Sequence, residues 1–157
     1  MVTIITGERN SGKTAFFEYW YNEVQRGSGF YTKKNYENNN FRGYELVLLP
    51  TRETVPFITV WQPQHAYAGG PILTEKLVVD LSVFPLVEKK LERALALPDE
   101  PVWIDEIGMR ELSGNGFDPL VRKILDACSD IRLVVKKSLL QKVVGHYGIG
   151  RFSLVYV

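Results

Sequence analysis

The chain has 157 residues, of which 45% are hydrophobic and 24% charged, so it can bury a substantial core and is not a disordered segment. The 19 basic and 18 acidic residues give a formal net charge of +1, which excludes a strong overall field that would attract nucleic acid or an anionic membrane. A single cysteine, Cys128, excludes an internal disulfide framework and a metal site of four thiolates. With no apolar run near the ~18 residues needed to cross a bilayer, the sequence predicts one domain over residues 1–157 in the cytoplasm.

The first predicted elements are a strand and a helix. Residues 1–6 are apolar and rich in β-branched side chains, which is typical of a buried parallel strand. Between Lys13 and about Arg26 the large apolar side chains recur at helical spacing, and Gly27 is suited to end the helix. The sequence therefore predicts a strand, a short loop and a helix in direct succession.

The next region, residues 29–61, has the pattern of antiparallel strands. Its β-rich runs lie at residues 29–32, 44–49 and 55–61. The asparagine-rich residues 35–40 between the first two runs predict a polar hairpin loop. We expect this region to form an antiparallel hairpin insertion in the fold.

The rest of the chain alternates predicted strands with predicted helices. Strands are expected at residues 77–81, 102–104, 131–135 and 152–157, and helices from residue 85, from residue 118 and over residues 139–144. Pro85 opens the first of these helices, and Asp118 with Pro119 is expected to cap the second. Because strands that alternate with helices form a covered sheet, the predicted fold class is α/β, with a mostly parallel central sheet and helices on both faces.

The segment between the first strand and the first helix matches the phosphate-loop pattern G-x-x-x-x-G-K-[S/T] at every fixed position. Its residues are Gly7, Glu8, Arg9, Asn10, Ser11, Gly12, Lys13 and Thr14. The two glycines permit the backbone to bend around a phosphate, and the loop amides point at the anion. We expect Lys13 to bridge the β- and γ-phosphates of a nucleoside triphosphate and the Thr14 hydroxyl to bind Mg²⁺. A strand and a helix flank the pattern as this mechanism requires, which disfavours a chance match.

Two adjacent acids, Asp105 and Glu106, end the apolar run at residues 102–104. Side chains at the carboxyl end of a parallel strand face the crevice where α/β proteins bind ligands. We expect Asp105 to hold a water of the Mg²⁺ shell and Glu106 to position or deprotonate the attacking water. Because further strands separate the acids from the phosphate loop in the sequence, an extra strand is expected between the two motif strands in the sheet.

Further segments carry a family resemblance beyond GERNSGKT. They are GFYTKK at residues 29–34, Gly43-Tyr44, VVDLSVFPLVEKKLERAL at residues 78–95, IDEIGMREL at residues 104–112, and residues 117–125. In these segments the chain resembles a small nucleoside-triphosphatase family first described from thermophiles, a P-loop family with a RecA-like α/β fold. The resemblance implies slow, Mg²⁺-dependent hydrolysis of ATP, GTP and related nucleotides. It also implies phosphate and metal contacts on residues 7–14 and Asp105, and a catalytic carboxylate on Glu106.

Two positions depart from the pattern of that family. Met109 stands where the family has a lysine, beside Arg110, and the family's arginine ahead of a Gly-Phe pair is displaced by one residue, to Arg42. Glu111 is a further acid within the same motif. Whether Arg9, Arg42 or Arg110 assists catalysis stays open.

The sequence thus predicts a nucleoside triphosphatase that converts ATP- or GTP-type nucleotides to nucleoside diphosphate and phosphate. Lys13 and Glu106 are its predicted catalytic residues, and Thr14 and Asp105 its predicted metal ligands. Two alternatives stay open, a P-loop kinase for a nucleotide or small molecule and a weakly hydrolysing regulatory module that binds nucleotides. The preferred nucleotide and the oligomeric state are not determined by the sequence.

Several other residues have plainer interpretations. Those that border the irregular loop at residues 62–71 are interpreted as packing residues rather than stacking platforms for a base; they are Trp61, His65 and Tyr67. His146 and Cys128 lack companions at metal or catalytic spacing and are interpreted as structural. The lysine pairs 33–34 and 136–137 lack interleaved aromatic residues, so nucleic acid is not a favoured partner.

Overall fold

The computed structural model describes residues 1–62, 72–74, 76–97 and 99–157. Its strands are β1 (Val2–Gly7), β2 (Ser28–Glu37), β3 (Asn40–Leu49), β4 (Thr54–Val60), β5 (Ile72–Thr74), β6 (Leu77–Val79), β7 (Val102–Ile107), β8 (Ile131–Lys136) and β9 (Phe152–Tyr156). Its helices are α1 (Lys13–Val24), α2 (Val83–Leu95), α3 (Met109–Leu112), α4 (Asp118–Ala127), the 3₁₀ turn η1 (Lys137–Leu139) and α5 (Leu140–Tyr147). Within these described ranges, no helix is long and apolar enough to span a membrane.

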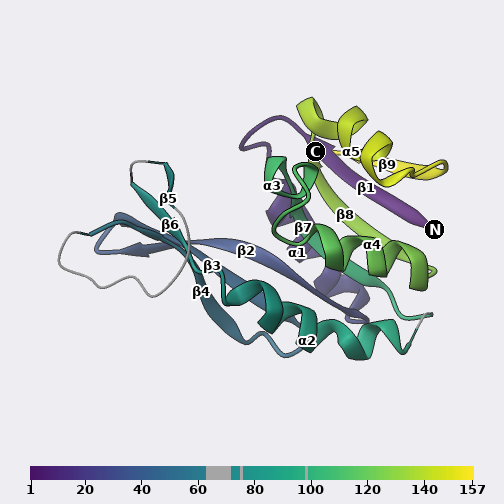
Figure 1. The fold of residues 1–157 in the computed structure, drawn as a ribbon, viewed down its shortest axis with the longest axis horizontal. Coiled ribbons are helices and arrows are strands. Elements are labelled where there is room, and N and C mark those ends of the chain that lie inside the picture. The colour runs from purple at the N-terminus through teal and green to yellow at the C-terminus, as the bar shows by residue number, and fades with distance from the viewer. Residues whose placement is uncertain (63–71, 75, 98) are drawn as a thin grey trace.

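The described strands form one sheet in the order β5-β6-β4-β3-β2-β7-β8-β1-β9. The strands β2, β7, β8, β1 and β9 pair in parallel, whereas β2, β3, β4, β6 and β5 pair antiparallel. Figure 1 shows the antiparallel strands extending away from the parallel half. The predicted parallel central sheet with an antiparallel insertion near residues 29–61 is therefore confirmed, and β2 belongs to both parts.

Helices cover both faces of the sheet, as predicted. On one face α1 buries Phe17 and Tyr21 against Trp103 of β7. On the other face α2 and α4 bury a larger apolar cluster that includes Val87 and Val121. Because successive side chains of a strand point to opposite faces, one buried strand such as β8 supplies apolar residues to both clusters. This double burial explains why the parallel strands are almost continuously apolar.

The prediction of a polar loop over residues 35–40 was wrong. The strands β2 and β3 continue to Glu37 and from Asn40, and only Asn38 and Asn39 form the turn. Both turn residues have left-handed backbones, with φ of 50° and 62°. Asparagine tolerates this conformation, and it is the one that a two-residue hairpin turn requires. The asparagines therefore mark the turn, while their polar neighbours pair as exposed strand residues.

Two predicted helix boundaries also differ from the structure. Helix α1 ends at Val24 and is followed by Gln25 in the left-handed region, so Gly27 is not its stop. Helix α2 begins at Val83 rather than Pro85. The cause lies in the preceding turn, where the Asp80 carboxylate accepts hydrogen bonds from the backbone and the hydroxyl of Ser82.

Asp118 does not cap α4, contrary to the prediction. Phe117 occupies the capping position, and Asp118 is the first helical residue. The Asp118 carboxylate lies 2.8 Å from His146 Nε2 on α5 and accepts a hydrogen bond from Arg122 at 3.0 Å. These contacts lower the pKa of Asp118 against the opposing effect of burial. His146 thus joins α4 to α5, which agrees with its interpretation as a structural residue.

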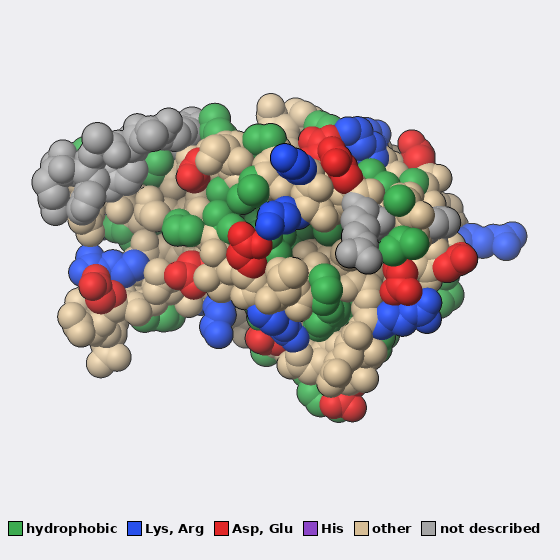
Figure 2. All heavy atoms as spheres, turned by 90° about the horizontal axis from the view of Figure 1, so that it is seen from below, with side chains coloured by type: hydrophobic (Ala, Val, Ile, Leu, Met, Phe, Trp, Pro, Cys, Tyr) green, Lys and Arg blue, Asp and Glu red, His purple; other side chains and the backbone are tan. Residues whose placement is uncertain are grey.

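The strand order places the two sequence motifs at one edge of the sheet. Strand β8 lies between β1 and β7, which confirms the predicted extra strand. Since all three strands are parallel, the phosphate loop after β1 and the acids near the end of β7 lie at the same edge. On the face seen in Figure 2, cationic and anionic side chains are interspersed rather than gathered into one patch.

Candidate active site

The phosphate loop connects β1 directly to α1. Gly12 precedes the helix with a φ of 92°, a conformation that side chains rarely permit. The loop is closed by a backbone hydrogen bond from Ser11 to the Glu8 carbonyl at 3.2 Å, and Phe16 donates to the Gly12 carbonyl at 2.8 Å. The first amides of α1 are therefore left free for an anion at the helix N-terminus.

Gly7 has a different role from the one predicted. Its φ is not in the left-handed region, so conformational freedom does not explain the glycine. A Cβ atom built on Gly7 would lie 2.1 Å from the Val157 carbonyl oxygen and 2.5 Å from Ser11 Oγ. The glycine is needed because the backbone after β9 passes directly beside the loop.

Lys13 is the first residue of α1, and only 7% of it is exposed. Its ammonium Nζ donates a hydrogen bond to the Glu8 carbonyl at 2.5 Å, so the side chain lies along its own loop. Lys13 also lines a pocket of about 670 Å³ at the edge of the sheet. The ammonium is therefore held at the loop while its side chain borders the space that a phosphate would enter.

A hydrogen bond joins the two motifs. Thr14 Oγ1 donates to Asp105 Oδ2 at 2.9 Å, and the backbone amide of Thr32 donates to the same oxygen at 3.4 Å. The other oxygen, Asp105 Oδ1, is buried without a hydrogen-bond partner. Thr14 and Asp105, which are 91 positions apart in the sequence, thus meet. Their contact leaves Asp105 Oδ1 without a hydrogen-bond partner.

Burial controls the charge of Asp105, which is 1% exposed. Loss of solvent, with a smaller contribution from the neighbouring Glu106 carboxylate, raises the pKa of Asp105 to about 7 against the lowering effect of the hydrogen bond from Thr14. A cation bound at this carboxylate would favour its charged form. The Asp105 carboxylate is thus suited to bind a cation.

Glu106 follows Asp105 on β7 and lines the same pocket as Lys13. Its carboxylate Oε1 lies 3.0 Å from the ammonium of Lys136, the last residue of β8. Lys136 also lines the pocket, and its Cα pairs in register with that of Gly7. A carboxylate and a cation therefore stand together between the phosphate loop and the end of β7.

The pocket has cationic and polar walls. It is lined by Arg9, Asn10, Gly12, Lys13, Thr14, Ala15, Glu18, Thr32, Lys33, Lys34, Tyr44, Glu106 and Lys136. Five of the eight predicted phosphate-loop residues therefore border the pocket: Arg9, Asn10, Gly12, Lys13 and Thr14. Sequence reasoning had assigned no site role to Lys136, Tyr44 or Glu18, because their position depends on the strand order and on α1 packing over β2.

Other candidate residues lie away from the pocket. The Arg110 guanidinium lies over the Phe84 ring at 5.7 Å, and Arg42 pairs with Glu37 across the hairpin at 3.0 Å. Met109 is exposed and does not line the pocket. Arg110 therefore does not border the pocket, whereas Arg9 does.

Glu111 is a structural acid. Its carboxylate accepts hydrogen bonds from the backbone amides of Gly108 at 3.0 Å and Phe117 at 3.2 Å. It is 5% exposed, and burial raises its pKa. These bonds hold the segment after β7 around α3.

Of the remaining candidates, those in the described part of the chain do not border the pocket. Trp61 is 41% exposed and does not line the pocket, while His65 and Tyr67 lie outside the described residues. Among the residues that the structure describes, no cluster of three or more His, Cys, Asp or Glu side chains could hold a metal by itself. A metal at Thr14 and Asp105 would need ligands from the substrate or from water.

Comparison with known proteins agrees with this geometry. A family model described as NTPase matches residues 2–153. The nucleoside-triphosphatase THEP1 of Thermotoga sp. strain RQ2 is 30% identical over 138 residues, which cover 88% of this chain and 75% of that protein. The protein of the same name from Thermotoga maritima strain MSB8 is also 30% identical over 138 residues, with the same shares covered.

Solved structures share the fold. The crystal structure of THEP1 from the hyperthermophile Aquifex aeolicus has a TM-score of 0.74 at 21% identity, covering 99% of this chain and 89% of that one. The solution structure of a human cancer-related nucleoside triphosphatase has a TM-score of 0.72 at 21% identity, covering 99% of this chain and 87% of that one. With its phosphate loop and its paired acids in place, the chain belongs to the NTPase family, whose small P-loop fold it shares.

Proposed function

We propose that the chain is a Mg²⁺-dependent enzyme that hydrolyses ATP- or GTP-type nucleotides to nucleoside diphosphate and phosphate in the cytoplasm. The observation that carries the proposal is the hydrogen bond from Thr14 to Asp105, because it brings the phosphate loop and the acidic strand into one site. The chain has a single cysteine, Cys128, and so cannot form an internal disulfide, which is compatible with a reducing compartment.

The oxygen atoms at the end of β7 suit Mg²⁺. The ion prefers hard oxygen ligands, keeps several waters and is commonly held by one or two protein groups plus substrate phosphates. The Thr14 hydroxyl and the unsatisfied, buried Asp105 Oδ1 fit this pattern. Thr14 would hold the ion directly and Asp105 through a water. When bound, the ion neutralises charge that develops on the β- and γ-phosphates.

The protein's own groups would supply positioning and electrostatic stabilisation. The loop amides and Lys13 would hold the β- and γ-phosphates, while Glu106 would orient the attacking water on the side away from the loop. Lys136, at 3.0 Å from Glu106, would keep that carboxylate at the pocket wall and face the terminal phosphate. Most of the rate acceleration would therefore come from charges fixed before the substrate arrives.

The substitution Glu106→Gln tests this assignment. Gln keeps the size of the side chain but removes its charge and its basicity, so kcat for phosphate release should fall by about 10²–10⁴-fold. Binding of the nucleotide should persist, because phosphate and metal contacts lie on other residues. Thermal-shift measurements with Mg²⁺ and each common nucleoside triphosphate check binding and rank the nucleotides; a ligand at ~100 times its Kd adds about 2.7 kcal/mol of stability.

A matched control is Glu88→Gln on α2, where the carboxylate pairs with Lys123 at the surface. This variant should hydrolyse as fast as the parent. If Glu106→Gln also hydrolyses as fast, Glu106 is not the catalytic carboxylate. If the parent binds nucleotides with Mg²⁺ but releases no phosphate, the chain is the regulatory binding module that the sequence left open.

A further inference from the structure

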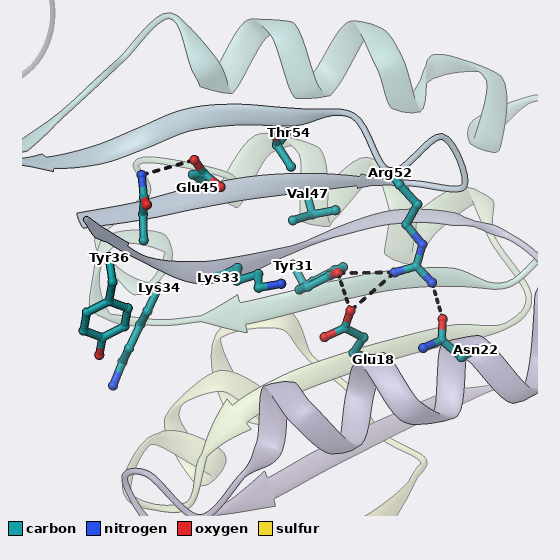
Figure 3. A pocket seen from close by; sticks show the side chains of 11 residues that line it. Glu18, Asn22, Tyr31, Lys33, Lys34, Tyr36, Glu45, Val47, Arg52 and Thr54 are labelled. Atoms are coloured by element: carbon teal, nitrogen blue, oxygen red, sulfur yellow. Dashed lines mark hydrogen bonds and ion pairs between the residues drawn. The ribbon is translucent and has the colours of Figure 1, made fainter. Parts of the chain in front are cut away.

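A second hollow lies beside the nucleotide pocket, between α1 and the strands β2, β3 and β4. Its volume is about 530 Å³, within the range of small-molecule sites. Figure 3 shows its lining side chains: Glu18, Asn22, Tyr31, Lys33, Lys34, Asn35, Tyr36, Glu45, Val47, Arg52 and Thr54. Three of them, Glu18, Lys33 and Lys34, also line the nucleotide pocket, so the two spaces meet.

The far end of the hollow is a preformed wall. The Tyr31 hydroxyl donates to Glu18 at 2.8 Å, and Arg52 Nη1 donates to the same hydroxyl at 3.2 Å. Arg52 also donates to Asn22 and lies over the Tyr21 ring at 5.0 Å. These contacts tie α1 to β2 and to the turn after β3, as Figure 3 shows. The side chains of this wall are thus held in place by one another without a ligand.

Charge pairing leaves an excess of positive charge where the two spaces meet. Glu18 accepts a hydrogen bond from Tyr31 and pairs with Arg52. Glu45 accepts a hydrogen bond from the neutral Asn35 amide at 3.2 Å and keeps its negative charge, so Lys33, Lys34 and Arg52 outnumber the two carboxylates. Lys33 and Lys34 have no ion pair or side-chain hydrogen bond within the described part of the chain, and both are exposed. Lys33 and Lys34 are consecutive on β2 and therefore leave opposite sides of the strand: Figure 3 shows Lys33 pointing toward Tyr31 and Lys34 pointing away from it. The ammonium group of Lys33, which lines both spaces, favours an anion such as a phosphate group at the junction.

The position of the hollow matches the direction of attack in phosphoryl transfer. In an in-line displacement the nucleophile approaches opposite the leaving group. The phosphate loop after β1 would hold the leaving diphosphate, and Glu106 on β7 marks the opposite side. The next strand beyond β7 is β2, which carries Lys33 and Lys34. A nucleophile other than water would therefore arrive from the second hollow.

We propose that this hollow binds a nucleoside monophosphate, whose phosphate lies beside Lys33 at the junction and accepts the terminal phosphoryl group of the triphosphate. The nucleoside would occupy the end lined by Asn22, Arg52 and Thr54, whose amide, guanidinium and hydroxyl groups are suited to hydrogen bonds with a base or sugar. The inference rests on the proposed nucleotide site and adds a second substrate to it.

The transfer step is balanced without another reactant. A phosphate oxygen of the monophosphate forms a bond to the terminal phosphorus of the triphosphate. The bond between that phosphorus and its bridging oxygen breaks, and the electron pair stays on the departing diphosphate. Two nucleoside diphosphates result, and no proton needs to be moved.

The test uses the full chain with Mg²⁺ and nucleoside triphosphate labelled on its terminal phosphate. Each of the 5′-monophosphates AMP, GMP, CMP, UMP and dTMP is added in turn, and labelled phosphate and labelled diphosphate are measured in the same reaction. At least one monophosphate should yield labelled diphosphate. Thr54→Trp, which fills the hollow from an exposed strand position, should lower this transfer at least ~10-fold in kcat/KM while phosphate release changes less than about twofold.

The matched control is Thr59→Trp, the same exchange at an exposed position of the same strand that does not line the hollow. It should change neither product. Label found only in phosphate with every monophosphate overturns the inference while the proposed hydrolysis stands. Transfer that Thr54→Trp leaves intact overturns the assignment to this hollow. If neither labelled product forms, the proposed function itself fails.

Discussion

The two halves of the sheet hold their charged side chains in different ways. In the parallel half, Asp105 and Lys13 are buried, and each is fixed by a hydrogen bond. In the antiparallel half, Lys33 and Lys34 are exposed, without an ion pair among the residues that the structure describes, on a strand that belongs to both halves. Buried groups cannot adjust their position or their hydration, whereas exposed lysines adapt at little cost.

This difference separates two tasks. The rigid, partly desolvated groups of the parallel half suit transition-state stabilisation, which depends on charges oriented in advance. The exposed groups of the antiparallel half suit recognition of a mobile, charged ligand.

Replacement of Lys13 by Met should strongly impair hydrolysis. The substitution keeps a long aliphatic chain but removes the charge beside the terminal phosphates, so kcat/KM should fall by about 10²–10³-fold. Steady-state phosphate release checks this, with Lys142→Met on α5 as a control. Parent-like hydrolysis by the Lys13 variant would contradict the assignment of the phosphate loop.

Asp105→Asn should stabilise the protein without nucleotide while it impairs hydrolysis. Burial raises the pKa of Asp105 to about 7, whereas the unfolded chain releases this proton near 3.8. The folded state therefore binds more protons between these values, and stability falls as the pH rises through the interval. Asn removes this loss, so the free energy of unfolding should increase by roughly 2–4 kcal/mol at pH 8 and little at pH 4.

Urea unfolding at both pH values measures the Asp105 effect. Asp126→Asn, an exposed acid on α4, serves as the control and should change stability by less than about 0.5 kcal/mol. A gain that is equal at pH 4 and pH 8 would show that the buried charge is not its cause.

Lys136→Met should lower kcat by about tenfold and change KM less, because the lost charge acts on Glu106 and on the terminal phosphate. Lys136→Arg should recover part of the loss, since it restores the cation with a different shape. The neighbouring Lys137 pairs with Glu8 at 3.1 Å and does not line the pocket. Lys137→Met is therefore the control, and equal losses in the two Met variants would argue against a specific role for Lys136.

Arg110→Ala should have the smallest effect on catalysis, less than about twofold in kcat/KM. The Arg110 guanidinium lies over Phe84 of α2, and it does not line the nucleotide pocket. Loss of the cation–π contact should lower stability by about 0.5–1 kcal/mol. Phosphate release and urea unfolding measure the two effects, and a large catalytic loss would return Arg110 to the list of candidate catalytic groups.

The sequence predicted the local parts of the site well. The phosphate loop is contiguous, and its flanking strand and helix follow from apolar patterns of short range. The acids at 105 and 106 were recognisable because they follow an apolar run, although β7 continues through them to Ile107. Their meeting with Thr14 also followed, since parallel strands present their carboxyl ends at one edge.

Features that depend on contacts across the fold were not predictable in the same way. Lys136 follows an ordinary apolar strand, and only the placement of β8 between β1 and β7 brings it to Glu106. Gly7 looked like a flexible loop residue, although the backbone at Val157 is what excludes a side chain there. Asp118 had the sequence of a helix cap, yet a histidine 28 residues away engages its carboxylate.

The strand inserted between the two motif strands has a consequence for the size of the reaction chamber. Neighbouring strands lie ~4.8 Å apart, so β1 and β7 are separated by about 10 Å at the edge where the motifs stand. That width admits a phosphoryl group with an ion and a water in a row, and a sheet with adjacent motif strands would offer half of it. Strand β8 thus sets the distance between the phosphate loop after β1 and Glu106 on β7.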